Sequence, residues 1–383
     1  MKPSTLPLLL LCAGISIALP LEAEASRLSV PASRRAREAP RHSVVEIASM
    51  QRLVERGFFE YAPSEEAAPA RDEFTGELAV GTRDGYLRLF DASGRETWRA
   101  GLGAAPTGPA FFTDAAVLVA TADGLLFSLD RFSGEVRWSL SLRAQVTMPM
   151  AEDFGTLLVG TDRDEVYAID LESGERLWVY RRSVGRDLRV RGGVGVAVEE
   201  GRVFAGFSDG SLLALAVEDG RILWEAVTAP GSARRFTDAD AAPVVRNGTV
   251  YSTVFNDGVY AFDAAKGSIR WRQDAQGAHS LRLHDDLLLV GGAKQVLALS
   301  AENGARVWAL PLGASYVHRP TVVGRIAFLA GPDGLRMVEA KTGRPLEIFQ
   351  PGSGFGASVA AGANGVYALS NLGILYELRL VAP

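Results

Sequence analysis

The chain has 383 residues, of which 48% are hydrophobic and 22% are charged, as in an ordinary soluble globular protein. Its formal net charge of -5 argues against a nucleic-acid partner. The single cysteine, Cys12, excludes a disulfide framework and leaves no thiolate chemistry in the body of the protein.

The first 25 residues have the three parts of a secretory signal peptide. Lys2 is the basic start, residues 6–19 are mostly apolar, and Ala23-Glu24-Ala25 is an A-x-A cleavage site. The apolar run is shorter than the ~20 residues that a membrane-spanning helix needs. We therefore predict export with cleavage after Ala25. Cys12 leaves a lipoprotein open as the alternative, although Leu11 precedes it where a small residue is expected.

Residues 26–56 are predicted to form a flexible basic tether. Residues 26–42 contain five arginines, one glutamate and two prolines, which is typical of a disordered segment. The tether is either a solvated spacer or a contact for anionic lipid head groups or the cell wall. Within residues 44–56 the spacing of Ile47, Met50 and Val54 is compatible with one or two helical turns, and the sequence leaves helix or strand open.

From residue 57 onward the chain is organised by a repeated turn in which a glycine is followed, four residues later, by a tryptophan. All six tryptophans occupy this position, 40, 40, 46, 47 and 37 residues apart: Trp98, Trp138, Trp178, Trp224, Trp271 and Trp308. A period of about 40–45 residues with four short strands per unit is typical of the blades of a β-propeller. We expect each tryptophan to lie across the neighbouring blade, in a structural role.

The two ends of the repeat region are incomplete in complementary ways. Gly343 starts a seventh copy in which Glu347 replaces the tryptophan, and residues 365–380 supply two further strands without the motif. A propeller that closes by pairing strands from its two ends leaves no sheet edge open. We therefore predict that Phe58 to Tyr61 is the outer strand of the last blade. The resulting fold is all-β, an eight-bladed propeller over residues 57–383.

The cadence A-x-D-x-x-(S/T)-G-x-x-x-W, as in Ala168 to Trp178, resembles the quinoprotein-type (PQQ-like) propeller repeat. This resemblance covers roughly residues 57–380. It is specific for the fold and uninformative about function.

A narrower resemblance concerns two loops of the fourth and fifth repeats. Arg235 to Gly248 looks like the R-x-x-D-x-D-x-x-P-V-V-x-N-G segment of BamB, a subunit of the outer-membrane β-barrel assembly machine, and Leu188 to Gly192 resembles the L-x-L-R-G segment of that family. In BamB these loops lie together and dock on the periplasmic domains of BamA, the barrel-inserting subunit. The resemblance implies the same partner for loops 183–192 and 229–243, through Leu188, Val190, Arg191, Asp238 and Asp240.

The spacing of the repeats indicates the same region. The two longest tryptophan intervals, 46 and 47 residues, hold these loops, and loops longer than a repeat needs are where propellers carry function. Both connect an outer strand to the next inner strand, so they should emerge side by side on one face. A structural alternative is that Arg191 pairs with Asp238 or Asp240 across two blades.

The motifs of an enzyme are missing from the sequence. The four histidines have no metal-ligand spacing, and no G-x-S-x-G, H-E-x-x-H or P-loop occurs. A quinoprotein dehydrogenase would need a calcium ion, a catalytic aspartate, usually adjacent cysteines, and a longer chain.

We therefore expect a monomeric, non-enzymatic scaffold without a cofactor or metal, located in the periplasm. Its membrane association would be indirect, or by a lipid anchor if Cys12 is acylated. A periplasmic propeller that binds another envelope protein or a cell-wall ligand is the alternative.

Overall fold

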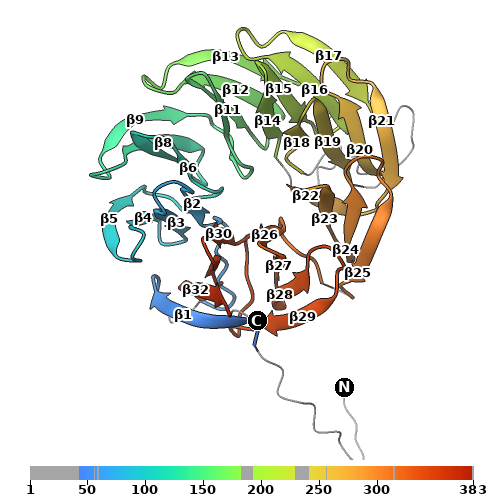
Figure 1. Ribbon diagram of the computed structural model, residues 1–383. Coiled ribbons are helices and arrows are strands. Elements are labelled where there is room, and N and C mark those ends of the chain that lie inside the picture. The colour runs from blue at the N-terminus through green and yellow to red at the C-terminus, as the bar shows by residue number, and fades with distance from the viewer. Residues whose placement is uncertain are drawn as a thin grey trace, which may run out of the picture. The chain divides into compact units, whose positions relative to one another are not determined.

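The computed structural model describes residues 43–55, 57, 60–182, 193–228, 241–255, 257–313 and 315–381. The predicted signal peptide, the tether over residues 26–42 and Cys12 lie outside the described residues. Within them all regular secondary structure is β, in eight four-stranded antiparallel sheets. The sheets stand around a common axis as the blades of a propeller (Figure 1), so the predicted all-β, eight-bladed fold is confirmed.

Each blade runs from an innermost strand at the axis to an outermost strand on the rim (Figure 1). Blades one to four comprise β2 (Ala70–Arg71), β3 (Leu78–Thr82), β4 (Tyr86–Phe90), β5 (Glu96–Gly101); β6 (Phe111–Phe112), β7 (Ala116–Ala120), β8 (Leu125–Asp130), β9 (Val136–Ser141); β10 (Ala151–Asp153), β11 (Thr156–Gly160), β12 (Glu165–Asp170), β13 (Arg176–Arg181); and β14 (Gly195–Glu199), β15 (Arg202–Gly206), β16 (Ser211–Ala216), β17 (Ile222–Val227).

The remaining blades follow the same order. Blades five to eight comprise β18 (Val244–Arg246), β19 (Thr249–Val254), β20 (Gly258–Asp263), β21 (Ile269–Asp274); β22 (Ala278–His284), β23 (Leu287–Gly292), β24 (Gln295–Ser300), β25 (Arg306–Pro311); β26 (Thr321–Val323), β27 (Ile326–Gly331), β28 (Gly334–Glu339), β29 (Pro345–Phe349); and β30 (Ala360–Gly362), β31 (Gly365–Leu369), β32 (Ile374–Leu380) with β1 (Val45–Arg52).

The outermost strand of blade eight comes from the N-terminal side of the chain. β1 pairs antiparallel with β32, with Val45 opposite Leu380 and Arg52 opposite Ile374. Of the helix and the strand left open for residues 44–56, the structure has the strand. Ile47 and Met50, whose spacing is compatible with a helix, are 53% and 64% exposed on this strand. Neither residue therefore marks a buried face.

The predicted closing strand at residues 58–61 is also wrong. Phe58 and Phe59 lie outside the described residues, and Glu60 and Tyr61 belong to no strand. The compact unit accordingly begins at Ser43 rather than at residue 57. The pairing partner of β32 is the preceding segment, β1, which pairs with it from Val45 opposite Leu380 to Arg52 opposite Ile374.

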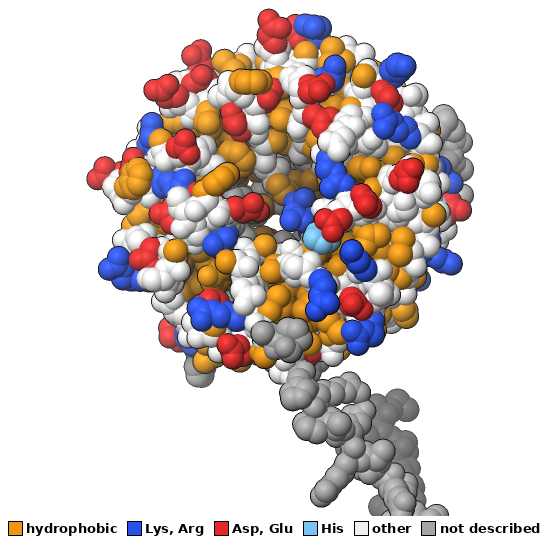
Figure 2. Space-filling model, in the orientation of Figure 1, with side chains coloured by type: hydrophobic (Ala, Val, Ile, Leu, Met, Phe, Trp, Pro, Cys, Tyr) orange, Lys and Arg blue, Asp and Glu red, His pale blue; other side chains and the backbone are white. Residues whose placement is uncertain are grey.

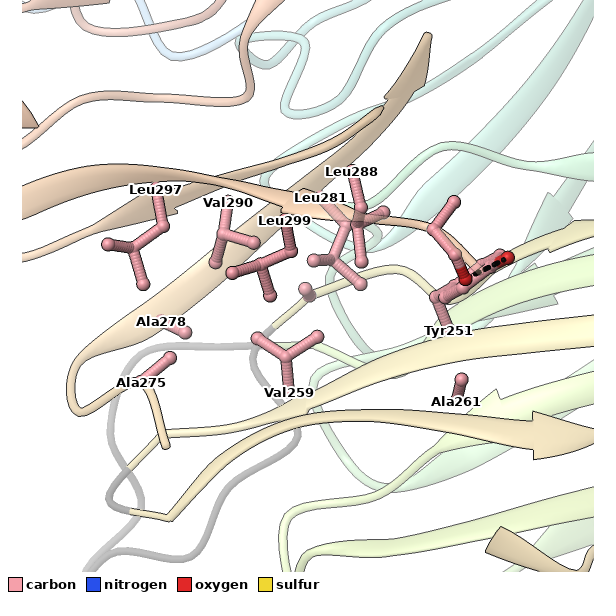
Figure 3. Packing of buried hydrophobic residues seen from close by; sticks show 12 residues of the cluster. Tyr251, Val259, Ala261, Ala275, Ala278, Leu281, Leu288, Val290, Leu297 and Leu299 are labelled. Atoms are coloured by element: carbon pink, nitrogen blue, oxygen red, sulfur yellow. Dashed lines mark hydrogen bonds between the residues drawn. The ribbon is translucent and has the colours of Figure 1, made fainter. Parts of the chain in front are cut away.

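The hydrophobic core lies between neighbouring blades, and the middle strands are buried on both faces. In Figure 3, Tyr251 and Val259 of blade five point toward Leu281, Leu288 and Leu299 of blade six. Burying both faces of a sheet requires strands that are apolar along their whole length. The sequence of the middle strands meets this requirement.

Each repeat tryptophan joins its blade to the next one. Its indole N–H donates to a backbone carbonyl of the following blade at 2.7 to 3.2 Å, in the pairs Trp98–Arg131, Trp138–Leu171, Trp178–Val217, Trp224–Ala264, Trp271–Ala301 and Trp308–Ala340. The ring lies on the glycine of the following repeat, where a Cβ atom would come within 2.5 to 2.7 Å of the indole. The glycine of the motif is therefore both a turn residue and the residue on which the tryptophan of the preceding repeat packs.

Glu347, at the seventh position, contacts the closing strand instead. Its carboxylate accepts hydrogen bonds from the backbone N–H of Val44 at 2.6 Å and from Ser43 Oγ at 2.9 Å. The polar replacement of the tryptophan thus holds the start of β1 against blade seven.

Candidate docking site on the connector face

Connections between blades share one face of the propeller with the turns between the second and third strands of each blade; we call it the connector face. The first residue of a connector donates its backbone N–H to such a turn, in the pairs Leu102–Gly85, Leu142–Gly124, Arg182–Asp164 and Leu312–Lys294. Most connectors are short, as over residues 102–110, 142–150, 275–277 and 312–320. The connectors over residues 182–194 and 228–243 are longer and flank blade four.

The first long connector starts from a charged anchor. Arg182 Nε donates to Asp209 Oδ2 at 2.6 Å and Arg182 Nη2 donates to Glu225 Oε1 at 2.7 Å, both on blade four. Its guanidinium lies over the ring of Phe207, 5.6 Å from the centroid. Burial alone would lower the pKa of Arg182, but the hydrogen bonds to Glu225 and Asp209 hold it above its ordinary value. The anchor stays charged and fully paired at neutral pH.

The second long connector starts from the same turn of blade four. Thr228 Oγ1 donates to the carbonyl of Gly210, next to Asp209. On its other side, the hydroxyl of Tyr260 in blade five lies 3.1 Å from the Thr228 carbonyl and accepts from Arg272 Nε at 3.1 Å. Burial and the contact with Asp257 raise the pKa of Tyr260 to about 12. Two blades therefore hold the first residue of this connector.

The two connectors also end beside each other. Val194 donates its backbone N–H to the Thr161 carbonyl at 3.0 Å, which fixes the return of the first connector to the axis. A Cβ atom on Gly195 would lie 2.2 Å from Cα of Ala242, so only glycine allows this close approach of the two backbones. Ala241, at the end of the second connector, is buried in the core between blades five and six.

The predicted contact residues Leu188, Val190, Arg191, Asp238 and Asp240 lie outside the described residues. The structure describes the points from which their loops depart and to which they return, and these points are adjacent at both ends. The sequence did not predict the pairing of Arg182 with Asp209 and Glu225, because these residues are 27 and 43 positions away from it.

A third long connector, over residues 53–69, joins blade eight to blade one. Glu65 is 1% exposed, accepts from the backbone N–H of Arg83 at 2.8 Å and forms an ion pair with its guanidinium. Burial raises the pKa of Glu65, although the hydrogen bonds from Arg83 oppose the shift. Its own N–H donates to Asn371 Oδ1 at 3.2 Å, so this connector is tied to the turns beneath it.

The described residues contain neither a metal-type cluster nor a helix that could span a membrane. Among the described residues there is no group of three or more His, Cys, Asp or Glu side chains arranged to hold a metal ion. None of these residues belongs to a helix long and apolar enough to span a membrane. Figure 2 shows one face of the propeller, hollowed at its centre, with acidic and basic side chains interspersed over it.

Comparison with known proteins identifies the family. The family model described as "Outer membrane protein assembly factor BamB" matches residues 83–310 and again residues 256–346, which together are more than half of the chain. The chain belongs to the BamB family. A BamB of Xanthomonas campestris pv. campestris is 29% identical over 188 residues, 45% of this chain and 46% of that protein. The chain thus spans less than half the length of this curated relative.

Solved structures agree with the BamB-family fold. The crystal structure of BamB from Moraxella catarrhalis superimposes with a TM-score of 0.73 at 19% identity, over 88% of this chain and 100% of that one. A quinohemoprotein alcohol dehydrogenase from Comamonas testosteroni matches with a TM-score of 0.69 at 13% identity, over 88% and 76%. Because an assembly factor and an enzyme match almost equally well, this likeness shows the fold alone.

Proposed function

We propose that this protein is a non-enzymatic scaffold subunit of an outer-membrane β-barrel assembly machine. It acts as a monomer in the periplasm, associated with the outer membrane, and binds the periplasmic domains of a BamA-like barrel-inserting subunit. The loops at residues 183–192 and 229–243 form the contact. Membership of the BamB family supports the class of function, and the relatives carry the name of an assembly factor.

We choose these loops as the binding surface because both long connectors are anchored on blade four. Their first residues, Arg182 and Thr228, bind Asp209 and Gly210 of one turn. At their other ends Gly195 lies against Ala242. We expect two loops that depart together and return together to present one surface to a partner. Loops held in this way by a rigid scaffold are typical binding elements.

The charges at the base of this surface indicate which residues recognise the partner. Arg182 and Arg272 are both paired with carboxylates of the propeller, so a partner would have to break existing ion pairs to use them. We therefore assign recognition to Arg191, Asp238 and Asp240, surrounding an apolar centre of Leu188 and Val190. An interface with apolar residues at its centre and charges at its rim is the usual arrangement.

Co-purification tests this assignment. The tagged protein is recovered from solubilised envelopes as wild type and as the double variant Arg191→Ala with Asp238→Ala. Truncating one member of a desolvated charge pair weakens binding by about 2–5 kcal/mol, which is more than tenfold. The double variant should therefore lose the barrel-inserting subunit, with an unchanged circular dichroism spectrum and melting temperature.

The matched control is Arg143→Ala with Asp333→Ala, two exposed residues of the connector face outside both long connectors. This control should recover the partner as well as wild type does. Equal recovery by the test variant would show that the loops do not form the contact. Absence of any barrel-assembly component from the wild-type sample, with another envelope protein or cell-wall material in its place, would contradict the function itself.

A further inference from the structure

Two buried polar atoms without partners lie close together on the innermost strand of blade six. Six buried side-chain nitrogen or oxygen atoms of the described residues have no hydrogen-bond partner: Arg71 Nε, Ser128 Oγ, Thr253 Oγ1, Ser280 Oγ, Arg282 Nε and Ser370 Oγ. Ser280 and Arg282 are two residues apart in the regular part of β22, so their side chains leave the same side of the strand. No other two of the six share a strand.

That side of β22 faces blade seven. Leu281, between the two, packs into the core shared with blade five, which turns its neighbours the other way. Ser280 Oγ lies against Gly291, and a Cβ atom on Gly291 would be 3.3 Å from the carbonyl oxygen of His318 in the connector to blade seven. Ser280 Oγ and Arg282 Nε therefore lie in the interface between blades six and seven, which we call the seam.

A second guanidinium enters this seam from the connector to blade seven. Arg319 Nε donates to the Leu281 carbonyl at 3.0 Å, which places its head group beside the backbone of Arg282. The part of the chain that the structure describes has no carboxylate in ion-pair contact with either arginine. Burial, and after it the charge of Arg282, lowers the pKa of Arg319 to about 10, so Arg319 remains cationic at neutral pH.

The neighbouring histidine adds no further positive charge. Burial lowers the pKa of His318 to about 4, so its ring is neutral at physiological pH, and its Nε2 lies 3.2 Å from the carbonyl oxygen of Phe355. β22 is the innermost strand of its blade, so this seam borders the central axis of the propeller (Figure 1).

We propose that Ser280, Arg282 and Arg319 form a binding site for a small oxyanion, a carboxylate or a phosphate, on the wall of the central hollow. Guanidinium groups match the geometry of both anions with paired N–H donors. A buried donor without an acceptor destabilises the folded state, and a bound oxyanion would give Arg282 Nε and the Ser280 hydroxyl their missing partner. The site is separate from the two long connectors and adds a ligand to the proposed scaffold function.

The test uses the full chain with two probes, sodium phosphate and sodium acetate, against sodium chloride at constant ionic strength. At least one oxyanion should raise the melting temperature saturably by several degrees beyond chloride, and comparison of the two identifies the chemistry. Arg282→Gln should weaken the apparent affinity at least tenfold and Ser280→Ala by a smaller factor. Arg306→Gln, on the exposed rim of the same blade, is the matched control and should change nothing.

A chemical measurement on the wild-type protein covers the case in which Arg282→Gln does not fold. The favoured oxyanion should slow phenylglyoxal modification of Arg282 and Arg319, read by peptide mass spectrometry, and leave Arg306 as reactive as before. The proposal is overturned if neither oxyanion acts beyond chloride. It is equally overturned if the Arg282 variant retains the full stabilisation, or if protection is the same at all three arginines.

Discussion

Gly220 meets two constraints that substitution can separate. Its φ of +72° lies in the left-handed region that an L-residue adopts only with strain, and a Cβ atom there would lie 2.7 Å from the indole of Trp178. Gly94 occupies the same turn in blade one with a φ of +82°, but nothing lies within 4 Å of its Cβ position. The difference arises because β1, the outer strand of the preceding blade, carries no tryptophan.

We predict that Gly94→Ala lowers the free energy of unfolding by about 1 kcal/mol, the cost of the left-handed conformation alone. Gly220→Ala should lower it by about 1–3 kcal/mol more, because the added methyl group displaces the indole of Trp178. Urea denaturation of the two variants beside wild type measures both values. Equal destabilisation would mean that the tryptophan is not seated on the glycine in solution.

At the scale of elements, closure depends on a strand that the repeat does not contain. β1 covers the edge of β32, and the Glu347 carboxylate fixes its first residues through Val44 and Ser43. An uncovered strand edge presents unpaired N–H and C=O groups that pair with other chains.

Removal of residues 43–52 should therefore lower the melting temperature by several degrees and produce concentration-dependent association. The point variant Glu347→Ala should act more mildly, by about 1 kcal/mol for its lost hydrogen bonds. Its control is Glu135→Ala, an exposed glutamate in the turn before β9 of blade two. Calorimetry and size-exclusion chromatography follow both effects. A truncated chain that remained monomeric with an unchanged melting temperature would refute this account of closure.

The sequence allowed prediction of the blades but not of their closure. The tryptophan and glycine of each repeat contact each other across blades, so their spacing reports blade number and order directly. β1 carries no such signal. Val45 is its only buried residue, and the exposed Ile47 and Met50 imitate helical spacing. The third long connector was not predicted, because Phe58 to Tyr61 within it was interpreted as a strand.

The sequence indicated where the two long connectors lie, but not which contacts anchor them. Long intervals between Trp178, Trp224 and Trp271 located the two connectors, because extra residues have to leave the regular blade. The anchors depend on contacts between distant residues, such as Arg182 with Glu225 and Tyr260 with Thr228, and no local pattern marks them.

At the scale of the whole molecule, the two faces of the propeller carry different loops. The long connectors leave from the connector face, whereas the turn between β10 and β11, with Phe154 at its tip and 97% exposed, lies on the opposite face. A partner that docks on the connectors should therefore approach one face only. This directional property distinguishes a docked scaffold from a propeller that associates with envelope components over its whole surface.

Site-specific photocrosslinking in intact cells tests this central claim most directly. A photoreactive residue is placed at Leu188, in the first long loop, and in a separate variant at Phe154, which is exposed on the opposite face. The account predicts a crosslink from position 188 to the barrel-inserting subunit of the assembly machine and none from position 154. Crosslinks of equal yield from both positions, or a crosslink to that subunit from position 154 alone, would contradict it.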